Sequence, residues 1–453
     1  MNTAYALTQP SGGAVHVPAH ERLVLPNGIT LLIVPSPDVP LISFHAVFRG
    51  GPVGDSKSGV ASLVAGLFDK GAGARNAFEF VDALEGAGGS FTTITGTEAL
   101  SISGQFLARD QSLMLELLAD ALTRPHFAAD EFETLRARRI ELIKATKDSD
   151  PAEVLGTYGR ALLFGQHPYG KPSAGSEQSL AAITHQDVLE YYRAQIGADR
   201  LILVFAGDLD VAALKRDVTE RLGGWRKAGT LAAPVVEPAR VRGRRVLLVD
   251  SPESAQTYFW IGNVGVNKQY PEHAALDLVN TLYGGRFTSL LNTELRIKSG
   301  LSYSARASFT RTIAAGEFAI RSFTDTENTG TALDLSLETL TRLKTAGVTA
   351  EMLDSARSYV LGQYPMNFET AADWAAALVE LEFYGLGPDY IDDYAAKLRE
   401  VTLPVARAVI DQAFPNNDDL VIVLIGDAEK IRAVARRYGE VTEMSLTHPS
   451  FTP

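Results

Sequence analysis

The sequence predicts an α+β protein made of two homologous domains joined by a linker, each a mostly antiparallel sheet covered by helices. Helical and strand patterns mix along the chain without strict alternation, which is typical of α+β folds. The pattern of residues 34–45 returns at 249–260, and that of residues 203–208 returns at 422–427. The offsets, 215 and 219 residues, are nearly constant. Such agreement at both ends of the repeat indicates a duplicated unit rather than a chance match.

The length and composition of the chain support this division. A chain of 453 residues is too long for one hydrophobic core, and 46% hydrophobic with 21% charged residues is an ordinary globular composition. After Gly224 a stretch with two prolines shows neither helical nor strand periodicity. We therefore expect domains at residues 1–225 and 241–453, a linker at 226–240, and a Pro/Gly-bearing extension over residues 1 to about 20.

The first domain opens with two strands, residues 28–34 and 41–48, joined by a proline-rich turn. Apolar residues at helical spacing from Val60 to Phe68 predict the buried face of a helix that ends at Gly71. The remaining helical patterns fall at residues 76–87, 110–123, 130–147, 151–164 and 185–195, and the remaining strand patterns at 90–95, 99–107 and 201–207.

The second domain contains the most informative stretch, from Arg286 to Tyr303. A helix ending near Ser299, with Gly300 as its left-handed terminal residue, is predicted by apolar side chains at helical spacing: Phe287, Leu290, Leu291 and Leu295. From Leu301 the pattern has period two, which predicts a strand with one face formed by Leu301, Tyr303, Ala305, Ala307 and Phe309. Arg296 thus lies in the last helical turn, and the glycine turn can bring its guanidinium close to the phenol of Tyr303.

Both Arg296 and Tyr303 are hydrogen-bond donors. The stretch closely resembles the C-terminal signature of the pitrilysin/insulinase-type zinc metallopeptidases, in which an Arg and a Tyr seven residues apart, around a Gly-Leu, contact the substrate backbone. The resemblance implies that Arg296 and Tyr303 bind a peptide substrate. On this stretch alone, the alternative is that Arg296 only complements the helix C-terminus and Tyr303 is an ordinary strand residue.

The resemblance extends over nearly the whole chain, yet the zinc site of the family is missing. Active members carry His-x-x-Glu-His on the first helix, where two histidines bind zinc and the glutamate polarises water. Here these three positions are Ser62, Ala65 and Gly66. The third ligand of the family, a glutamate on a later helix, falls near Leu142. Its neighbour Glu141 is interpreted as a solvated surface charge, because a slip of one residue turns a side chain by about 100° around a helix.

No other metal site or catalytic motif is recognisable in the sequence. Only His16 and His20 lie close together among the eight histidines, and Pro18 between them argues against a shared helix face. The glycine cluster at 86–89 lacks the flanking strand and helix of a dinucleotide-binding turn. It precedes the strand at 90–95, which the resemblance implies is a sheet edge where a peptide or neighbouring chain can lie.

Charge and composition exclude several classes of function. The 42 basic and 54 acidic residues give a net charge of −12, which argues against nucleic-acid binding. The absence of cysteine excludes disulfides and thiolate chemistry. Neither a signal peptide nor a membrane span is recognisable. We expect a soluble protein without nucleic-acid or membrane partners, cytoplasmic in location, or periplasmic if a signal peptide was removed.

The hypothesis that combines these observations is the substrate-binding, non-zinc subunit of a heteromeric zinc metallopeptidase. The resemblance implies that one subunit of such complexes supplies zinc while the other supplies the Arg/Tyr pair. We expect this chain to bind unfolded peptides through Arg296 and Tyr303, to hold no cofactor itself, and to be inactive without a homologous zinc-bearing partner. Two alternatives are a non-catalytic scaffold homologue, like the core proteins of respiratory complexes, and a peptidase active alone through an unrecognised site.

Overall fold

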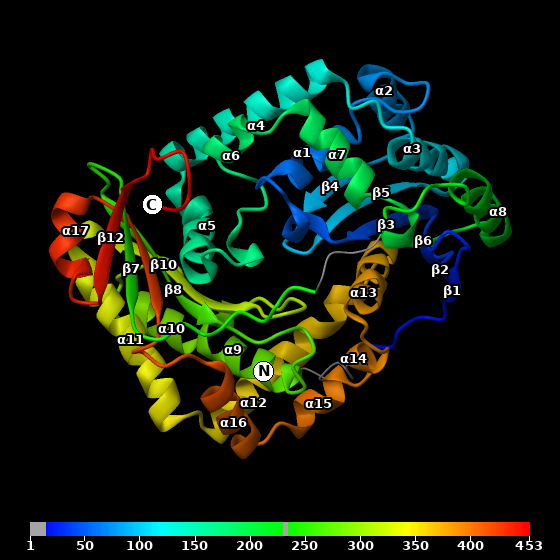
Figure 1. The fold of residues 1–453 in the computed structure, drawn as a ribbon. Helices are drawn as coiled ribbons and strands as arrows, with labels where there is room; N and C mark the ends of the chain where they lie inside the picture. The colour runs from blue at the N-terminus through cyan, green and yellow to red at the C-terminus, as the bar shows by residue number, and fades with distance from the viewer. Residues whose placement is uncertain (1–14, 230–233) are drawn as a thin grey trace, which may run out of the picture.

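A computed structural model describes residues 15–229 and 234–453, which form two six-stranded sheets with helices (Figure 1). Residues 1–14 of the expected extension and 230–233 of the expected linker lie outside the described residues. The first sheet has the order β1-β2-β6-β3-β5-β4, and its strands are β1 (Glu21–Val24), β2 (Thr30–Pro35), β3 (Leu41–Arg49), β4 (Thr92–Thr95), β5 (Ala99–Leu107) and β6 (Leu201–Gly207). The second has the order β12-β7-β11-β8-β10-β9, and its strands are β7 (Arg245–Asp250), β8 (Gln256–Val264), β9 (Ala305–Phe309), β10 (Glu317–Asp325), β11 (Val421–Gly426) and β12 (Glu440–Ser445). The expected α+β class is confirmed.

Helices accompany both sheets. Those of the first half are α1 (Val60–Leu67), α2 (Ala77–Gly86), α3 (Gln111–Thr123), α4 (Ala129–Ser149), α5 (Pro151–Phe164), α6 (Glu177–Ala181), α7 (His185–Gln195) and α8 (Val211–Leu222). Those of the second half are α9 (His273–Asn280), α10 (Leu290–Asn292), α11 (Thr329–Ala346), α12 (Ala350–Gln363), α13 (Ala371–Tyr384), α14 (Asp389–Asp392), α15 (Tyr394–Glu400), α16 (Leu403–Ala413) and α17 (Ala428–Ala435). Capping boxes at Asn76, Thr184 and Thr370 fix the starts of α2, α7 and α13, because each side chain accepts a hydrogen bond from a backbone N–H of the first turn.

The two sheets repeat one topology. Strands β2 and β3 correspond to β7 and β8, with the offset of 215 residues seen in the sequence, and β6 and β11 occupy the same inner position. The outermost strand differs between the copies. In the first sheet β1 precedes the unit and pairs antiparallel to β2, whereas in the second sheet β12 follows the unit and pairs parallel to β7.

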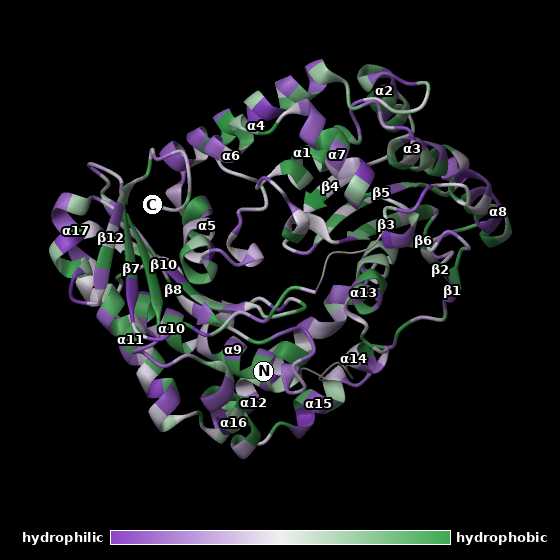
Figure 2. Ribbon diagram, in the orientation of Figure 1, coloured by the Kyte–Doolittle hydropathy of each residue, from purple (hydrophilic) through white to green (hydrophobic). Residues whose placement is uncertain are grey.

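The inner strands are apolar because both faces of each sheet are covered. All residues of β6 and β11 are buried, and each of these strands pairs in parallel with one neighbour and antiparallel with the other. Figure 2 shows hydrophilic and hydrophobic residues alternating along the surrounding helices. This is the pattern of helices with one face on a sheet and the other toward solvent.

One face of each sheet is covered by a helix from the other half of the chain. Helix α5 packs on the second sheet, where Leu155 and Tyr158 join Trp260 in one buried cluster. Helix α13 packs on the first sheet, where Leu378 joins Val204. Figure 1 shows both helices on the sides of the sheets that face each other, while helices of the same half cover the opposite sides. The expected limits at 1–225 and 241–453 therefore divide the strands between the sheets but do not divide the helical layers.

Polar contacts also join the halves. The carboxylate of Glu98 accepts hydrogen bonds from the backbone N–H of Ile313, at 2.9 and 3.1 Å, and from the hydroxyl of Tyr169. The chain end returns to the first half, because the Lys147 ammonium donates to the His448 carbonyl at 2.7 Å. Within residues 15–229 and 234–453, no helix has the length and apolar character needed to cross a membrane.

The contact between α5 and the second sheet gives a direct test of the helix exchange. A Cβ added at Gly159 would lie 2.6 Å from the Trp260 ring, whereas one at Gly86, the last residue of α2, would meet nothing within 4 Å. Gly159→Ala should lower the free energy of unfolding by about 1–3 kcal/mol despite the better helix propensity of alanine, because the core is overfilled. Gly86→Ala should be neutral or stabilising. Urea unfolding measures both, and equal stability of the two variants would contradict this packing.

Candidate functional site

The helix before the Arg/Tyr pair is shorter than the sequence predicts. The Ser289 side chain caps it by accepting from the Asn292 N–H at 3.3 Å, and α10 continues as a π-helical turn, Thr293–Lys298. Gly300 follows with φ +65°, as expected for a left-handed terminal residue. Phe287 was counted among the residues at helical spacing, but it precedes the cap and is 60% exposed. Its place in the helix was wrongly predicted, because the cap at Ser289 leaves Phe287 outside the helix.

The strand expected from Leu301 starts four residues later, at Ala305. Serine side chains hold the intervening segment in a turn: the Ser302 hydroxyl donates to the Ser304 carbonyl at 2.9 Å and accepts from the Ser304 N–H at 3.1 Å. Tyr303 therefore lies in this turn, not in a strand, and is 75% exposed. The alternation is correct further on, where Ala305 and Ala307 are buried.

The structure brings Arg296 to Tyr303, but through the backbone. Arg296 Nη1 donates to the Tyr303 carbonyl at 2.7 Å, and its guanidinium carbon lies 4.8 Å from the centre of the Phe287 ring. This bond fixes the turn and leaves other guanidinium N–H groups to donate to a ligand. The Tyr303 side chain is exposed, and among the described residues the bond between Tyr303 and Arg296 involves only the Tyr303 backbone.

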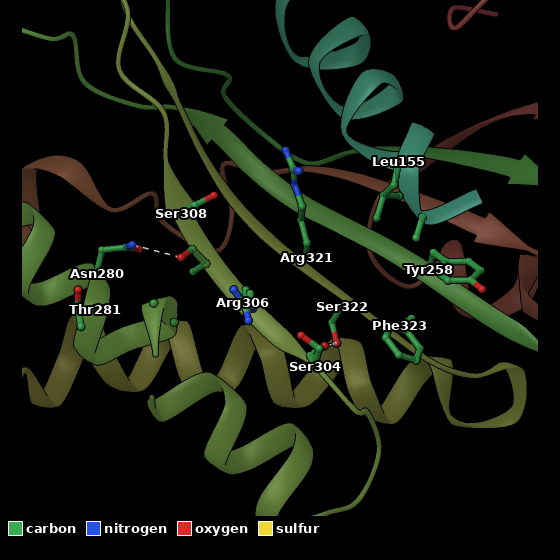
Figure 3. A pocket seen from close by; sticks show the side chains of 14 residues that line it. Leu155, Tyr258, Asn280, Thr281, Ser304, Arg306, Ser308, Arg321, Ser322 and Phe323 are labelled. Atoms are coloured by element: carbon green, nitrogen blue, oxygen red, sulfur yellow. Dashed lines mark hydrogen bonds between the residues drawn. The ribbon is translucent and has the colours of Figure 1, made fainter. Parts of the chain in front are cut away.

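Arg296 lines a pocket of about 250 Å³ together with Arg286, Phe287, Arg306 and Tyr359. A second pocket of about 550 Å³ lies along β8, β9 and β10 beneath α5, and the two share Arg306 and Ser304. Figure 3 shows this second pocket, with Arg321 reaching toward the part of α5 that carries Leu155. Arg306 was not selected as a candidate site residue from the sequence, although arginines at 286, 296 and 306 recur every ten residues.

The outer edge of β9 is already occupied by side chains. The Asn280 amide donates to the Ala307 carbonyl at 3.2 Å, drawn as a dashed line in Figure 3, and the Asn292 amide oxygen accepts from the Ala305 N–H at 3.2 Å. A peptide reaching this edge would therefore find these two backbone groups already bonded. In the first sheet β4 is an edge strand, as the resemblance implied, and its Ile94 is 59% exposed.

The helix that carries the zinc motif in active members, here α1, packs against α4 at the motif positions. Ser62 and Ala65 of α1 are buried, and a Cβ at Gly66 would lie 2.9 Å from both Arg139 and Leu135 of α4. Arg139 also donates to the Ser62 carbonyl at 3.4 Å. A guanidinium thus stands beside the positions that bind zinc in active members. Ser62 and Ala65 are therefore not available to a partner or peptide, and side chains of α4 lie against the partly exposed Gly66.

The remaining metal-site candidates are dispersed. Glu141 has a 70% exposed side chain and pairs with Lys144, as expected of a surface charge, and Leu142 is 63% exposed. His16 lies 4.0 Å from Asp392, while the His20 ring contacts the Pro18 carbonyl. Within the described ranges, three or more His, Cys, Asp or Glu side chains nowhere gather in a way that could hold a metal ion.

Comparison with known proteins identifies the family. Residues 48–175 match the model described as "Insulinase (Peptidase family M16)", and residues 182–360 match "Peptidase M16 inactive domain". The chain belongs to peptidase family M16. The second match contains the Arg296–Tyr303 segment, and the first contains the altered helix. The pitrilysin/insulinase resemblance is thereby confirmed, in a chain whose zinc-motif positions hold serine, alanine and glycine.

Relatives and solved structures extend over most of the chain. It is 25% identical to an uncharacterized zinc protease of Mycobacterium leprae. The 395 aligned residues cover 86% of this chain and 88% of that protein. It is 23% identical to the non-peptidase homolog YmxG of Helicobacter pylori, over 86% and 90%. A crystal structure titled as a peptidase M16 inactive domain from Pseudomonas fluorescens superposes with a TM-score of 0.84 at 23% identity, over 90% of this chain and 98% of that chain. This last likeness shows the shared fold.

Asp55, which precedes α1, gives the site region a pH dependence. Burial raises the pKa of this carboxyl to about 7, against opposing hydrogen bonds from the backbone N–H groups of Gly59, Val60 and Ala61. An unfolded Asp titrates near pH 4, so the folded chain retains a proton that the unfolded chain loses between about pH 4 and 7. The stabilisation from Asp55 is complete below about pH 4 and is lost as pH rises through about 7.

We predict that Asp55→Asn removes this part of the pH dependence. Relative to the variant, the wild type should lose up to about 4 kcal/mol of unfolding free energy between pH 4 and 8. Urea unfolding at several pH values measures the difference. Asp418→Asn is the control, because that side chain is 99% exposed and should shift nothing. A difference between Asp55→Asn and wild type that does not change with pH would contradict the account.

We also predict that restoring the zinc motif by Ser62→His, Ala65→Glu and Gly66→His yields no stoichiometric zinc binding. Arg139 and Leu135 fill the space, and Leu142 offers no third ligand. Elemental analysis of the purified variant measures the zinc content. One zinc per chain, together with chelator-sensitive peptide hydrolysis, would overturn this prediction.

Proposed function

We propose that this chain is the substrate-binding, non-zinc subunit of a heteromeric zinc metallopeptidase that cleaves unfolded peptides. The observation that carries the proposal is a contrast between two segments of one chain. In α1, Ser62 and Ala65 are buried, and Arg139 lies against Gly66. The turn with Tyr303, by contrast, is exposed, and Arg296 beside it lines a pocket.

Exposed apolar side chains support a partner or substrate at this end of the molecule. Phe287, Ile297, Tyr303 and Tyr359 are 60%, 53%, 75% and 44% exposed. Three of them come from the single segment 287–303, and Phe287 and Tyr359 both line the pocket of Arg296. Gathered large hydrophobic residues of this kind mark surfaces that are covered in the working assembly.

The chemistry of the pair suits peptide hydrolysis in another subunit. When water attacks a peptide carbonyl, negative charge develops on its oxygen, and donors held nearby stabilise that charge. Arg296 is fixed by its bond to the Tyr303 carbonyl and has further N–H groups to donate. The Tyr303 side chain is 75% exposed, and its hydroxyl has no hydrogen-bond partner among the described residues. They could bind that oxygen or the next substrate carbonyl, so that the scissile bond meets zinc held by a homologous partner.

A non-catalytic scaffold role is the second candidate function. One observation favours it: Arg296 donates to a carbonyl of its own chain, so a purely structural role would explain its position. The naming of one relative as a non-peptidase homolog agrees with it. The two candidates differ in whether the Tyr303 hydroxyl matters, because that group makes no structural hydrogen bond among the described residues.

We predict that Tyr303→Phe or Arg296→Ala lowers the activity of the complex with a His-x-x-Glu-His homologue by about 30- to 1,000-fold. Loss of a donor to the transition state weakens kcat, whereas loss of uniform binding raises KM alone. Tyr270→Phe is the control, because its exposed hydroxyl contacts Gln412 instead. Kinetics, zinc content and complex mass are measured together. Full activity of the double variant in an intact complex would favour the scaffold role.

A further inference from the structure

We infer that the pocket between Arg286, Arg296 and Arg306, here called the arginine pocket, binds a carboxylate of the peptide substrate. The peptide origin of this carboxylate rests on the proposed function. The anion site itself rests on the charge and geometry of the pocket. Besides the three arginines, its lining consists of Gly285, Phe287, Asn292, Ser304, Ala305 and Tyr359, so it contains no acidic residue.

The three guanidinium groups lack the counter-charges that neighbouring arginines have. Arg321 pairs with Glu317, Arg342 with Glu294, and Arg357 with Asp354. In the described part of the chain, the ion pairs include none with Arg286, Arg296 or Arg306. The protein as a whole carries a net charge of −12, so an excess of basic residues does not explain the gap.

Local geometry adds to the unbalanced positive charge. Arg306 stands directly opposite Arg321 in the pairing of β9 with β10, and like charges across a strand pair repel. Arg286 Nη1 donates to the Ser355 hydroxyl at 3.1 Å, but its Nε is buried without a hydrogen-bond partner. A buried donor without an acceptor is unfavourable. An anion in the pocket would lie among three guanidinium groups that form no ion pair in the described part of the chain.

A carboxylate fits these donors better than a neutral group. The planar guanidinium fork matches the two oxygens of a carboxylate, and such charge-assisted bonds are stronger than neutral ones. Asn292 and Ser304 line the same pocket, beside the Phe287 ring over which Arg296 lies. The Asn292 amide is already bonded to the Phe287 carbonyl and the Ala305 N–H, so the arginines are the donors left for a ligand. A volume of about 250 Å³ holds one side chain or chain end of a peptide. Arg296 lines the pocket and also bonds the Tyr303 carbonyl. A peptide bound at the Tyr303 turn would therefore have the arginine pocket beside it, within reach of a neighbouring carboxylate.

The carboxylate can come from an Asp or Glu side chain or from the peptide C-terminus. The test uses the purified chain alone and four fluorescein-labelled octapeptides of one neutral sequence. They are the amidated peptide with Gln at its centre, its free-acid form, the amidated peptide with Glu at its centre, and the free acid of that Glu peptide. Fluorescence anisotropy measures affinity at low and high salt.

At least one carboxylate-bearing peptide should bind about tenfold or more tightly than the neutral amide, and salt should reduce the difference. Comparing the Glu peptide with the free acid distinguishes the two sources. Arg286→Gln and Arg306→Gln should each remove most of the preference, while Arg306→Lys should retain part of it. Arg109→Gln, which changes a 78% exposed side chain in the first half, should have no effect.

Equal affinity for charged and neutral peptides, or no binding by any of the four, would overturn the inference. So would a carboxylate preference that survives both Arg286→Gln and Arg306→Gln, with thermal denaturation showing that these variants are folded. The proposed function fails separately. A carboxylate preference in the isolated chain, together with full activity of the Arg296 and Tyr303 double variant in the complex, would keep the anion site and remove its assignment to peptide cleavage.

Discussion

The structure depends on one reciprocal packing interaction, the exchange of α5 and α13 between the two sheets. Both sheets are apolar on both faces, as the fully buried strands β6 and β11 require, and helices of the same half cover only one face of each. The second face is buried by a helix from the other half. Neither half is a closed unit by itself, so the halves are held in a fixed relation. The pocket between α5 and β10 is lined by residues of both halves, so its shape depends on this packing of α5 on the second sheet.

Duplication gave two related halves, and the present chain uses them differently. In the first half, the helix at the zinc position has become core, with Arg139 and Leu135 of α4 against Gly66. In the second half, the serine-held turn keeps Tyr303 in solvent and Arg296 against a pocket. Packing has thus closed over the zinc-motif positions, while the backbone around Tyr303 stays exposed. This contrast supports the proposed role as a substrate-binding subunit over the decay of an enzyme.

Much of the fold was readable from the sequence, because strand and helix periodicities and the offset of 215 residues are local or repeated signals. Arg296 and Tyr303 were found by their resemblance to a family signature. The exchange of α5 and α13 was not predictable, since the periodicity of an amphipathic helix does not say which sheet it covers. The late start of β9 depends on the Ser302 side chain, which hydrogen-bonds to the backbone of Ser304. The arginine pocket depends on missing counter-charges, which only a three-dimensional structure reveals.

The central claim is that this chain completes a peptidase whose zinc is held elsewhere. The most direct measurement is a titration of the purified chain into a fixed amount of a His-x-x-Glu-His homologue, with hydrolysis of an unfolded peptide as the signal. The account predicts negligible activity for either chain alone and activity that rises to saturation at one chain per partner. Activity of the homologue that is unchanged by any amount of this chain would contradict the account.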